Sequence, residues 1–166
     1  MGISMETSVL GPDPDQQVVV FRLGDGSYAV DIAAVREIIR SQPITVVPLA
    51  PPFVVGVLNL RSSIVPVLDL RRRCGFPAAP QTRDSRIVVV QVEEATVGLQ
   101  VDSVSAVVTL SPNCIEPAAG LIGGGREQLL RGVARLDQSL IMLLDLKAAV
   151  NTAGQTDVTD AEPAVA

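Results

Sequence analysis

Short apolar runs separated by turn-forming residues dominate the pattern of this chain. The first run, 18–23, is followed by Gly24-Asp25-Gly26 and then by a second run over 27–30. Two short runs around a glycine-containing turn are typical of a β-hairpin. Because these runs are rich in β-branched residues, they favour strands over helices. The pattern predicts three further strands over 45–47, 54–60 and 64–68.

Two residues modify this pattern of strands. Asp31 can accept a hydrogen bond from an exposed backbone N–H, which predicts a short capped helical turn over 32–38. Pro66 has no backbone N–H to donate to a sheet ladder. The strand over 64–68 is therefore predicted to lie at a sheet edge or at a crossing position.

The chain contains an internal repeat. Residues 18–23 are similar to residues 87–92, which begin 69 positions later, and 28–32 are similar to 97–101 at the same offset. Two stretches of matching apolar pattern at one offset indicate that a structural unit occurs twice.

A longer block of the repeat follows at a larger offset. Residues 56–70 match residues 132–146, which begin 76 positions later, and seven of the fifteen aligned residues are identical. Five short strands per copy are typical of a small barrel. The chain is therefore predicted to be all-β, with two tandem, pseudo-repeated, five-stranded barrels packed together and short helical turns between strands.

The two ends differ in composition from the middle of the chain. Residues 1–15 and 151–166 are rich in Gly, Pro, Thr, Asp and Ala and lack apolar periodicity, so we predict a disordered N-terminal segment and a disordered acidic tail. Residues 16–150 are predicted to form the folded domain, with lobe one at about 16–80 and lobe two at about 81–150.

Residues suited to catalysis are scarce. The chain has no histidine, which removes Ser-His and Cys-His pairs and any phosphorylatable histidine. Cys74 and Cys114 lack Cys-x-x-Cys spacing and are predicted to be free thiols rather than metal ligands. The glycine-rich segment 120–126 lacks the Lys-Ser/Thr pair of a phosphate loop and is predicted to be a flexible loop. We therefore expect no enzymatic activity, no metal and no cofactor.

Charge and hydropathy exclude two classes of partner. The net charge of −5 argues against general nucleic-acid binding. No stretch approaches the roughly 20 consecutive apolar residues that a membrane-spanning helix needs. The N-terminus also lacks the basic start and apolar centre of a signal peptide. These features predict a cytoplasmic protein without direct membrane insertion.

Several charged residues have more than one interpretation. Asp69 and Asp145 occupy equivalent positions in the two copies, and helix capping is favoured over a pair of catalytic carboxylates. The run 71–73 of three arginines is either a solvated face or an electrostatic site for a partner. Cys74 beside this run is either a packed thiol or a reactive one.

The turn over 61–63 diverges between the two copies. Arg61 is aligned with Asp137, although the strands on both sides of the turn match closely. Strands that stay alike serve the fold, and an exposed turn that changes is free to bind something else. Any polar residue also suits a hairpin turn, but we favour a binding role for Arg61.

The central part of the chain resembles the signature of the CheW family. Residues 53–71 read FVVGVLNLRSSIVPVLDLR, and upstream residues 28–38 read YAVDIAAVREI. The segments 47–51, 97–107 and 132–146 are also similar to that family. The resemblance covers nearly all of residues 17–150.

This resemblance implies a fold of two SH3-like barrels and a non-catalytic scaffold in chemotaxis signal transduction. Its partners would be the regulatory domain of a CheA-type histidine kinase, at the apolar ends of the barrels, and the cytoplasmic tip of chemoreceptors. The implied receptor-binding residues are Val35, Glu37, Gly56, Arg61 and Val107. The implied location is the cytoplasm, with recruitment to membrane-associated receptor arrays. An adaptor of a pilus-motility or other chemosensory-like pathway is the alternative.

One position departs from the family pattern. The family usually has Gly directly after the Arg of this turn, whereas this chain has Ser62. Glycine readily adopts positive φ and serine resists it. The turn that carries Arg61 is therefore expected to differ in shape.

Overall fold

The computed structural model describes residues 15–117 and 129–150. Apart from Asp15, the segments predicted to be a disordered start and a disordered acidic tail lie outside these residues. The glycine-rich segment predicted to be a flexible loop also lies outside them.

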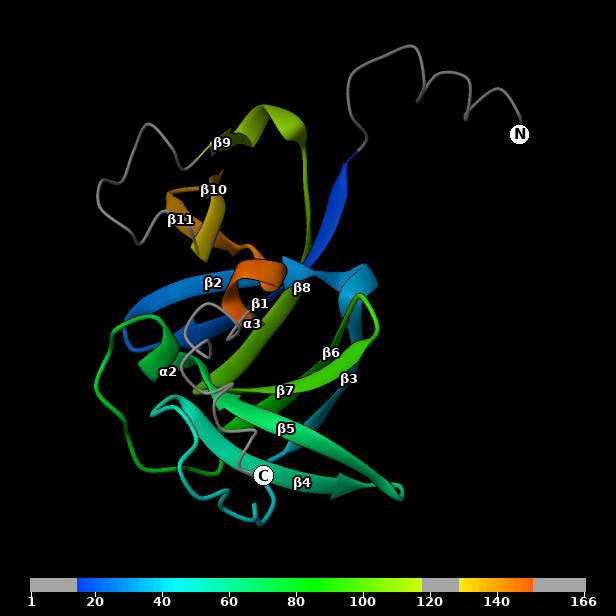
Figure 1. The fold of residues 1–166 in the computed structure, drawn as a ribbon. Coiled ribbons are helices and arrows are strands. Elements are labelled where there is room, and N and C mark those ends of the chain that lie inside the picture. Colours follow the sequence, from blue (N-terminus) through cyan, green and yellow to red (C-terminus); the bar gives the residue numbers. More distant parts are fainter. Residues whose placement is uncertain (1–14, 118–128, 151–166) are drawn as a thin grey trace.

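The described residues form two β-sheets with a few short helices (Figure 1). The first sheet has the strand order β8-β1-β2-β11-β10-β9. Its strands are β1 (Gln16–Leu23), β2 (Gly26–Asp31), β8 (Ser103–Leu110), β9 (Ile115–Pro117), β10 (Leu130–Leu136) and β11 (Ser139–Leu144).

The second sheet has the strand order β3-β6-β7-β5-β4. Its strands are β3 (Val35–Arg40), β4 (Val54–Leu60), β5 (Ser63–Asp69), β6 (Arg86–Val92) and β7 (Ala95–Val101). The short helices are η1 (Ile32–Ala34), α2 (Leu70–Arg73), η2 (Pro112–Cys114) and α3 (Leu146–Val150). The all-β prediction is confirmed. One sheet has the predicted five strands, and the other has six among the described residues.

The two sheets exchange strands between the copies of the repeat. β5 of the first copy pairs in parallel with β7 of the second, with Val67 opposite Gly98. β11 of the second copy pairs in parallel with β2 of the first, with Leu143 opposite Ala29. In Figure 1 the blue hairpin of β1 and β2 accordingly lies beside the orange strand β11. The predicted lobes at about 16–80 and about 81–150 therefore do not coincide with the sheets, because each sheet takes strands from both halves of the chain.

The predicted helical turn is shorter than expected. Only Ile32–Ala34 is helical, as a 3-10 turn in which Ala33 N donates to the Asp31 carboxylate over 3.0 Å. The capping role of Asp31 is confirmed, but the helix over 32–38 is wrong. From Val35 onward the chain forms β3, because its β-branched residues pair along β6.

The strand predicted over 45–47 is reduced to a single bridge. Thr45 exchanges two backbone hydrogen bonds of 2.8 Å with Val57 of β4. Pro43 and Pro48 lie on either side of this segment. Neither proline can donate a backbone hydrogen bond, so the ladder does not extend.

Pro66 does not lie at the edge of its sheet. β5 runs between β4 and β7, and Pro66 is opposite Val57 of β4. The parallel ladder with β7 starts one residue later, at Val67. Pro66 thus lies where β5 begins to pair with its second neighbour, which agrees with the predicted crossing position.

A core shared by both sheets holds the molecule together. Its fully buried members include Phe21 and Leu23 of β1 together with Val90 of β6 and Leu99 of β7. Two smaller clusters belong to one sheet each, around Leu143 in the first sheet and in the second around these residues: Leu58, Val67, Ile87 and Val89. Because the largest cluster joins the sheets, their relative position is fixed by apolar burial.

The two equivalent aspartates start equivalent helices. The Asp69 carboxylate accepts a hydrogen bond from Arg71 N at the start of α2, over 3.0 Å. The Asp145 carboxylate accepts one from Ala148 N in α3, over 3.1 Å. Each thereby satisfies a backbone N–H that has no partner within its helix. The capping interpretation of both aspartates is confirmed.

All three consecutive arginines bind within the fold. Arg72 donates to the backbone carbonyl of Pro52 over 3.1 Å and lies 3.9 Å from the Asp69 carboxylate. Arg71 lies 2.6 Å from the Asp102 carboxylate, whose Oδ2 also accepts from Gly24 N. Arg73 donates to the backbone carbonyls of Ala148 and Ala149 at the end of α3, and partial burial lowers its pKa. Arg71 and Arg73 thus connect α2 to the β1–β2 turn and to the last described helix, so they serve the fold.

Candidate functional site

The β4–β5 turn projects Arg61 from the second sheet. Leu60 pairs with Ser63, so the loop has two residues, Arg61 and Ser62. Their φ angles are 51° and 73°, as in the type I′ turn that matches the twist of a two-residue hairpin. Ser62 therefore adopts the positive φ that serine resists. The β4–β5 ladder imposes the turn, at a strain on the order of 1–2 kcal/mol per residue.

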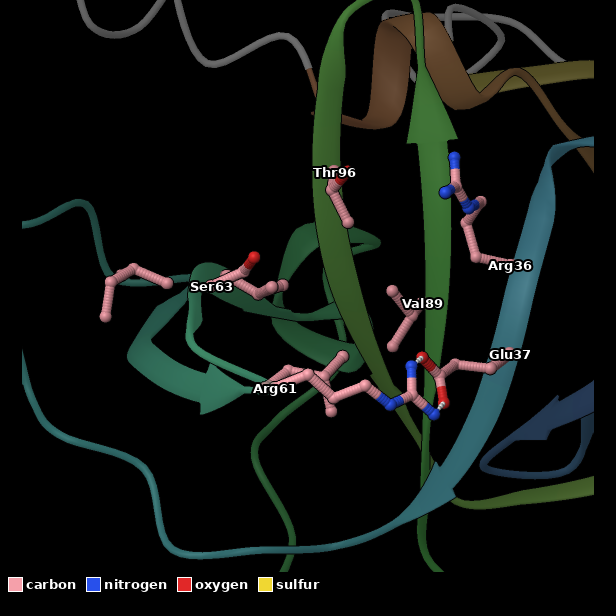
Figure 2. A pocket seen from close by; sticks show the side chains of 9 residues that line it. Arg36, Glu37, Arg61, Ser63, Val89 and Thr96 are labelled. Carbon is pink, nitrogen blue, oxygen red and sulfur yellow. Dashed lines mark hydrogen bonds and ion pairs between the residues drawn. The ribbon is translucent and has the colours of Figure 1, made fainter.

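Arg61 forms a bidentate ion pair with Glu37 of β3. Its Nη1 lies 2.7 Å from Glu37 Oε2 and its Nη2 lies 2.9 Å from Glu37 Oε1. The Arg61 side chain is 74% exposed and that of Glu37 is 24% exposed. Figure 2 shows the two side chains pointing toward each other from the β4–β5 turn and from β3. The parallel double hydrogen bond fixes the plane of an otherwise solvent-exposed guanidinium.

A pocket of about 460 Å³ lies beside this ion pair, and the two side chains of the pair form part of its lining (Figure 2). Residues of all five strands of the second sheet and of the β4–β5 turn line it: Arg36, Glu37, Leu60, Arg61, Ser63, Ile64, Val65, Val89 and Thr96. Ile64, beside the turn, is 66% exposed. The pocket therefore combines apolar surface, hydroxyl groups and charged groups, a composition suited to an amphipathic partner.

Gly56 has a structural role close to this site. It has a φ of +153°, and a Cβ at this position would lie 2.1 Å from the carbonyl oxygen of Thr45. It also lies at a register shift in the β4–β5 ladder, between Val54 and Gly56. Glycine is therefore required for β4 to approach Thr45. Gly56 shapes the strand that leads to Arg61 and does not line the pocket.

The two predicted valines lie apart from the ion pair. Val35 of β3 is half-buried and packs against the shared core. Val107 of β8, in the first sheet, is 51% exposed. The structure thus brings together Glu37 and Arg61 of the five predicted site residues. Val35, Gly56 and Val107 do not line the pocket.

Sequence reasoning missed seven of the nine residues that line the pocket. Four of the seven are polar or largely exposed: Arg36, Ser63, Ile64 and Thr96. Ile64 carried a usable signal, since it is a large apolar residue directly after a polar turn. Arg36 carried none, because regular alternation along a strand would place it on the face opposite Glu37.

The described residues show neither a metal centre nor a membrane span. No group of three His, Cys, Asp or Glu within 15–117 and 129–150 is placed to hold a metal ion. In the same ranges, no helix is long and apolar enough to cross a membrane. Cys74 and Cys114 are half-buried, and neither forms a disulfide.

Comparisons with known proteins give one consistent result. A family model described as the CheW-like domain matches residues 17–154. The chain is 38% identical to the chemotaxis protein CheW of Rhizobium meliloti over 131 residues, covering 79% of this chain and 84% of that protein. It is 31% identical to the chemotaxis protein CheW of Treponema pallidum over 138 residues, covering 81% of each.

A solved structure extends this agreement to the fold. The crystal structure of the scaffolding protein TtCheW from Thermoanaerobacter tengcongensis superposes with a TM-score of 0.79 at 33% sequence identity. The match covers 85% of this chain and 96% of that one. The chain therefore belongs to the CheW-like domain family.

Proposed function

We propose that this chain is a cytoplasmic, non-catalytic adaptor that couples chemoreceptors to a CheA-type histidine kinase. Family membership supports the proposal, since relatives over most of the chain are named chemotaxis proteins and the solved relative is named a scaffolding protein. The same membership agrees with the prediction that the chain is not an enzyme. Residues 16–150 would form the adaptor domain, recruited to receptor arrays at the membrane through its partners.

The observation that carries the proposal is the exposed, fixed guanidinium of Arg61. Glu37 uses one N–H on each terminal nitrogen of Arg61. A guanidinium has five N–H donors, so three remain for a partner. A side chain already held in one plane loses less conformational entropy on binding than a free one. Arg61 is therefore suited to bind a carboxylate or carbonyl of a receptor helix.

The other predicted residues support this site in different ways. Glu37 sets the pose of Arg61, and Gly56 shapes β4 before the turn. Val107 offers an exposed apolar contact on the first sheet. Val35, half-buried beside Arg36, supports the part of β3 that carries Glu37. An amphipathic receptor helix would place its apolar stripe on exposed apolar side chains such as Val107 and its polar edge at Arg61.

The kinase would bind elsewhere, on exposed apolar surface at the ends of the sheets. Val46 and Leu49, in the segment between β3 and β4, are 74% and 97% exposed. Leu140, after the β10–β11 turn, is 53% exposed. Large apolar side chains exposed in this way are a common feature of protein–protein contacts. Separate surfaces would let one adaptor hold both partners at once.

A pull-down from the native cytoplasm tests the proposal. Tagged wild type, Arg61→Ala and the matched control Arg83→Ala would each be used as bait, with recovered proteins identified by mass spectrometry. Wild type and the control should recover a histidine kinase and chemoreceptors. Arg61→Ala should keep the kinase and lose most of the receptors, because truncating a central anchor commonly costs about 2 kcal/mol or more.

Two outcomes would count against the proposal. If wild type recovers neither a kinase nor receptors, the coupling function is wrong. If Arg61→Ala recovers receptors as well as Arg83→Ala does, the adaptor function stands and the assignment of Arg61 is wrong.

A further inference from the structure

A bulge in β3 turns two consecutive side chains toward one pocket. In the ladder with β6, Val35 is opposite Val90 and Glu37 is opposite Val89. Arg36 is therefore the extra residue of a register shift. Neighbours in a regular strand point to opposite faces, yet Arg36 and Glu37 both line the pocket (Figure 2). Bulges re-aim side chains in this way next to functional sites.

The two arginines of this pocket differ in how their charge is balanced. Arg61 is neutralised by the Glu37 carboxylate. Arg36 donates from Nη1 to the side-chain oxygen of Gln91, a neutral amide. Within the described ranges, 15–117 and 129–150, no ion pair involves Arg36. The pocket thus has one positive charge more than its own carboxylate neutralises.

Gln91 fixes the position of the Arg36 guanidinium. Its Nε2 donates to the backbone carbonyl of Glu93 over 3.2 Å, which leaves Oε1 directed at Arg36. This contact occupies one N–H of Arg36, so the rest of its guanidinium can bind a further acceptor. The hydroxyls of Ser63 and Thr96 line the same pocket and can also donate.

We infer that Arg36 is a specificity-determining residue of this pocket, where it binds the carboxylate of an Asp or Glu side chain on the receptor helix that docks beside Arg61. The inference rests on the proposed function and adds the chemistry of the partner. A carboxylate accepts hydrogen bonds only, as a site built of guanidinium and hydroxyl donors requires. It also neutralises the excess charge. The pocket, at about 460 Å³, has room for such a side chain.

Calorimetric titration with a defined probe tests this inference. The probe is a soluble cytoplasmic hairpin fragment of a chemoreceptor from the same organism, titrated into the full chain at low and at high salt. Arg36→Gln should weaken binding about three- to tenfold at low salt. It should also reduce the salt dependence of the affinity, because one charge pair is lost. Arg36→Lys should keep most of the affinity and most of its salt dependence.

A second variant neutralises Arg36 without removing it. Gln91→Glu places a carboxylate of the chain itself against the Arg36 guanidinium. This variant should lower the affinity for the probe by a similar factor. Arg83→Gln and Gln81→Glu make the same chemical changes outside the pocket and should leave the affinity unchanged. Because Arg36 and Gln91 are not buried in the core, these variants are expected to fold, which circular dichroism would check.

The outcomes distinguish a failure of this inference from a failure of the proposed function on which it rests. If wild type binds the probe and Arg36→Gln binds it equally well, with equal salt dependence, the role of Arg36 is wrong and the proposed function stands. If wild type does not bind the probe and recovers no receptor from cytoplasm, both are wrong.

Discussion

The β4–β5 and β10–β11 hairpins occupy equivalent places in the two sheets, yet they differ in one respect. Both ladders have a register shift that ends at a glycine, Gly56 in one and Gly132 in the other. Both are followed by an aspartate that caps a short helix. An exposed aliphatic residue follows each turn, Ile64 in one and Leu140 in the other.

The turns themselves are where the two hairpins diverge. Arg61 extends from the first turn to a carboxylate on another strand of its sheet, β3. The equivalent residue of the second turn is Asp137, and the ion pair nearest to it in sequence joins Arg135 of β10 to Glu116 of the adjacent β9. The strands of both hairpins share the glycine register shift, and the first turn also forms a long-range ion pair with β3. The difference agrees with the proposed binding role of the β4–β5 turn, while the features that both hairpins share serve the fold.

Substituting the two glycines should have the largest effect and should affect the two hairpins unequally. Gly56→Ala places a methyl group against the Thr45 carbonyl at a φ of +153°, so it should lower the free energy of unfolding by about 2–3 kcal/mol. Gly132→Ala meets the Glu116 carbonyl at 2.8 Å and has no such φ, so about 1 kcal/mol is expected. Urea unfolding followed by circular dichroism measures both, since the chain has no Trp. Equal losses would show that the glycines are not distinguished by backbone strain.

A serine-to-glycine change should stabilise the first turn and not the second. Ser62 has a φ of 73°, so Ser62→Gly should raise the free energy of unfolding by about 0.5–1 kcal/mol. Gln138, at the same place in the second turn, is not among the described residues with positive φ. Gln138→Gly should therefore give no gain. A loss of stability in Ser62→Gly, read from the same unfolding curves, would contradict this account of the turn.

The smallest expected effect concerns the ion pairs. A double-mutant cycle of Arg61→Ala and Glu37→Ala should give a coupling free energy of about 0.5 kcal/mol, because exposed pairs contribute little to stability. The same cycle for Arg135 and Glu116, which are 63% and 46% exposed, should give less. Both couplings should fall at high salt. A coupling above about 2 kcal/mol for the first pair would make it a structural element of the sheet.

Much of the fold follows from local sequence signals. The strands at 18–23 and 54–60 have alternating or continuous apolar residues and clear turns, and all three aspartate caps involve residues within a few positions of one another. The error at 45–47 arose where prolines outside the run prevented a ladder. The error at 32–38 arose because pairing with β6, some fifty positions away, overrode a local helical preference.

The candidate site could be predicted only in part from the sequence, again because long-range pairing decides it. Arg61 was identified by its divergence from Asp137, and Glu37 by the family resemblance. Their ion pair joins positions 24 apart through the curvature of a sheet, which no local pattern encodes. The orientation of Arg36 toward the pocket depends on a bulge in β3. A single shift of register leaves no sign in an otherwise regular apolar pattern.

The exchange of β5 and β11 between the copies has a consequence for how the two halves could be separated. Each half of the chain supplies a strand that the other half must bind in parallel. The two halves therefore hold each other as the subunits of a domain-swapped dimer do, with the segment near residue 80 as their covalent tether. Cut at that tether, neither fragment would retain a complete sheet, and a stable fold would require the two fragments to associate.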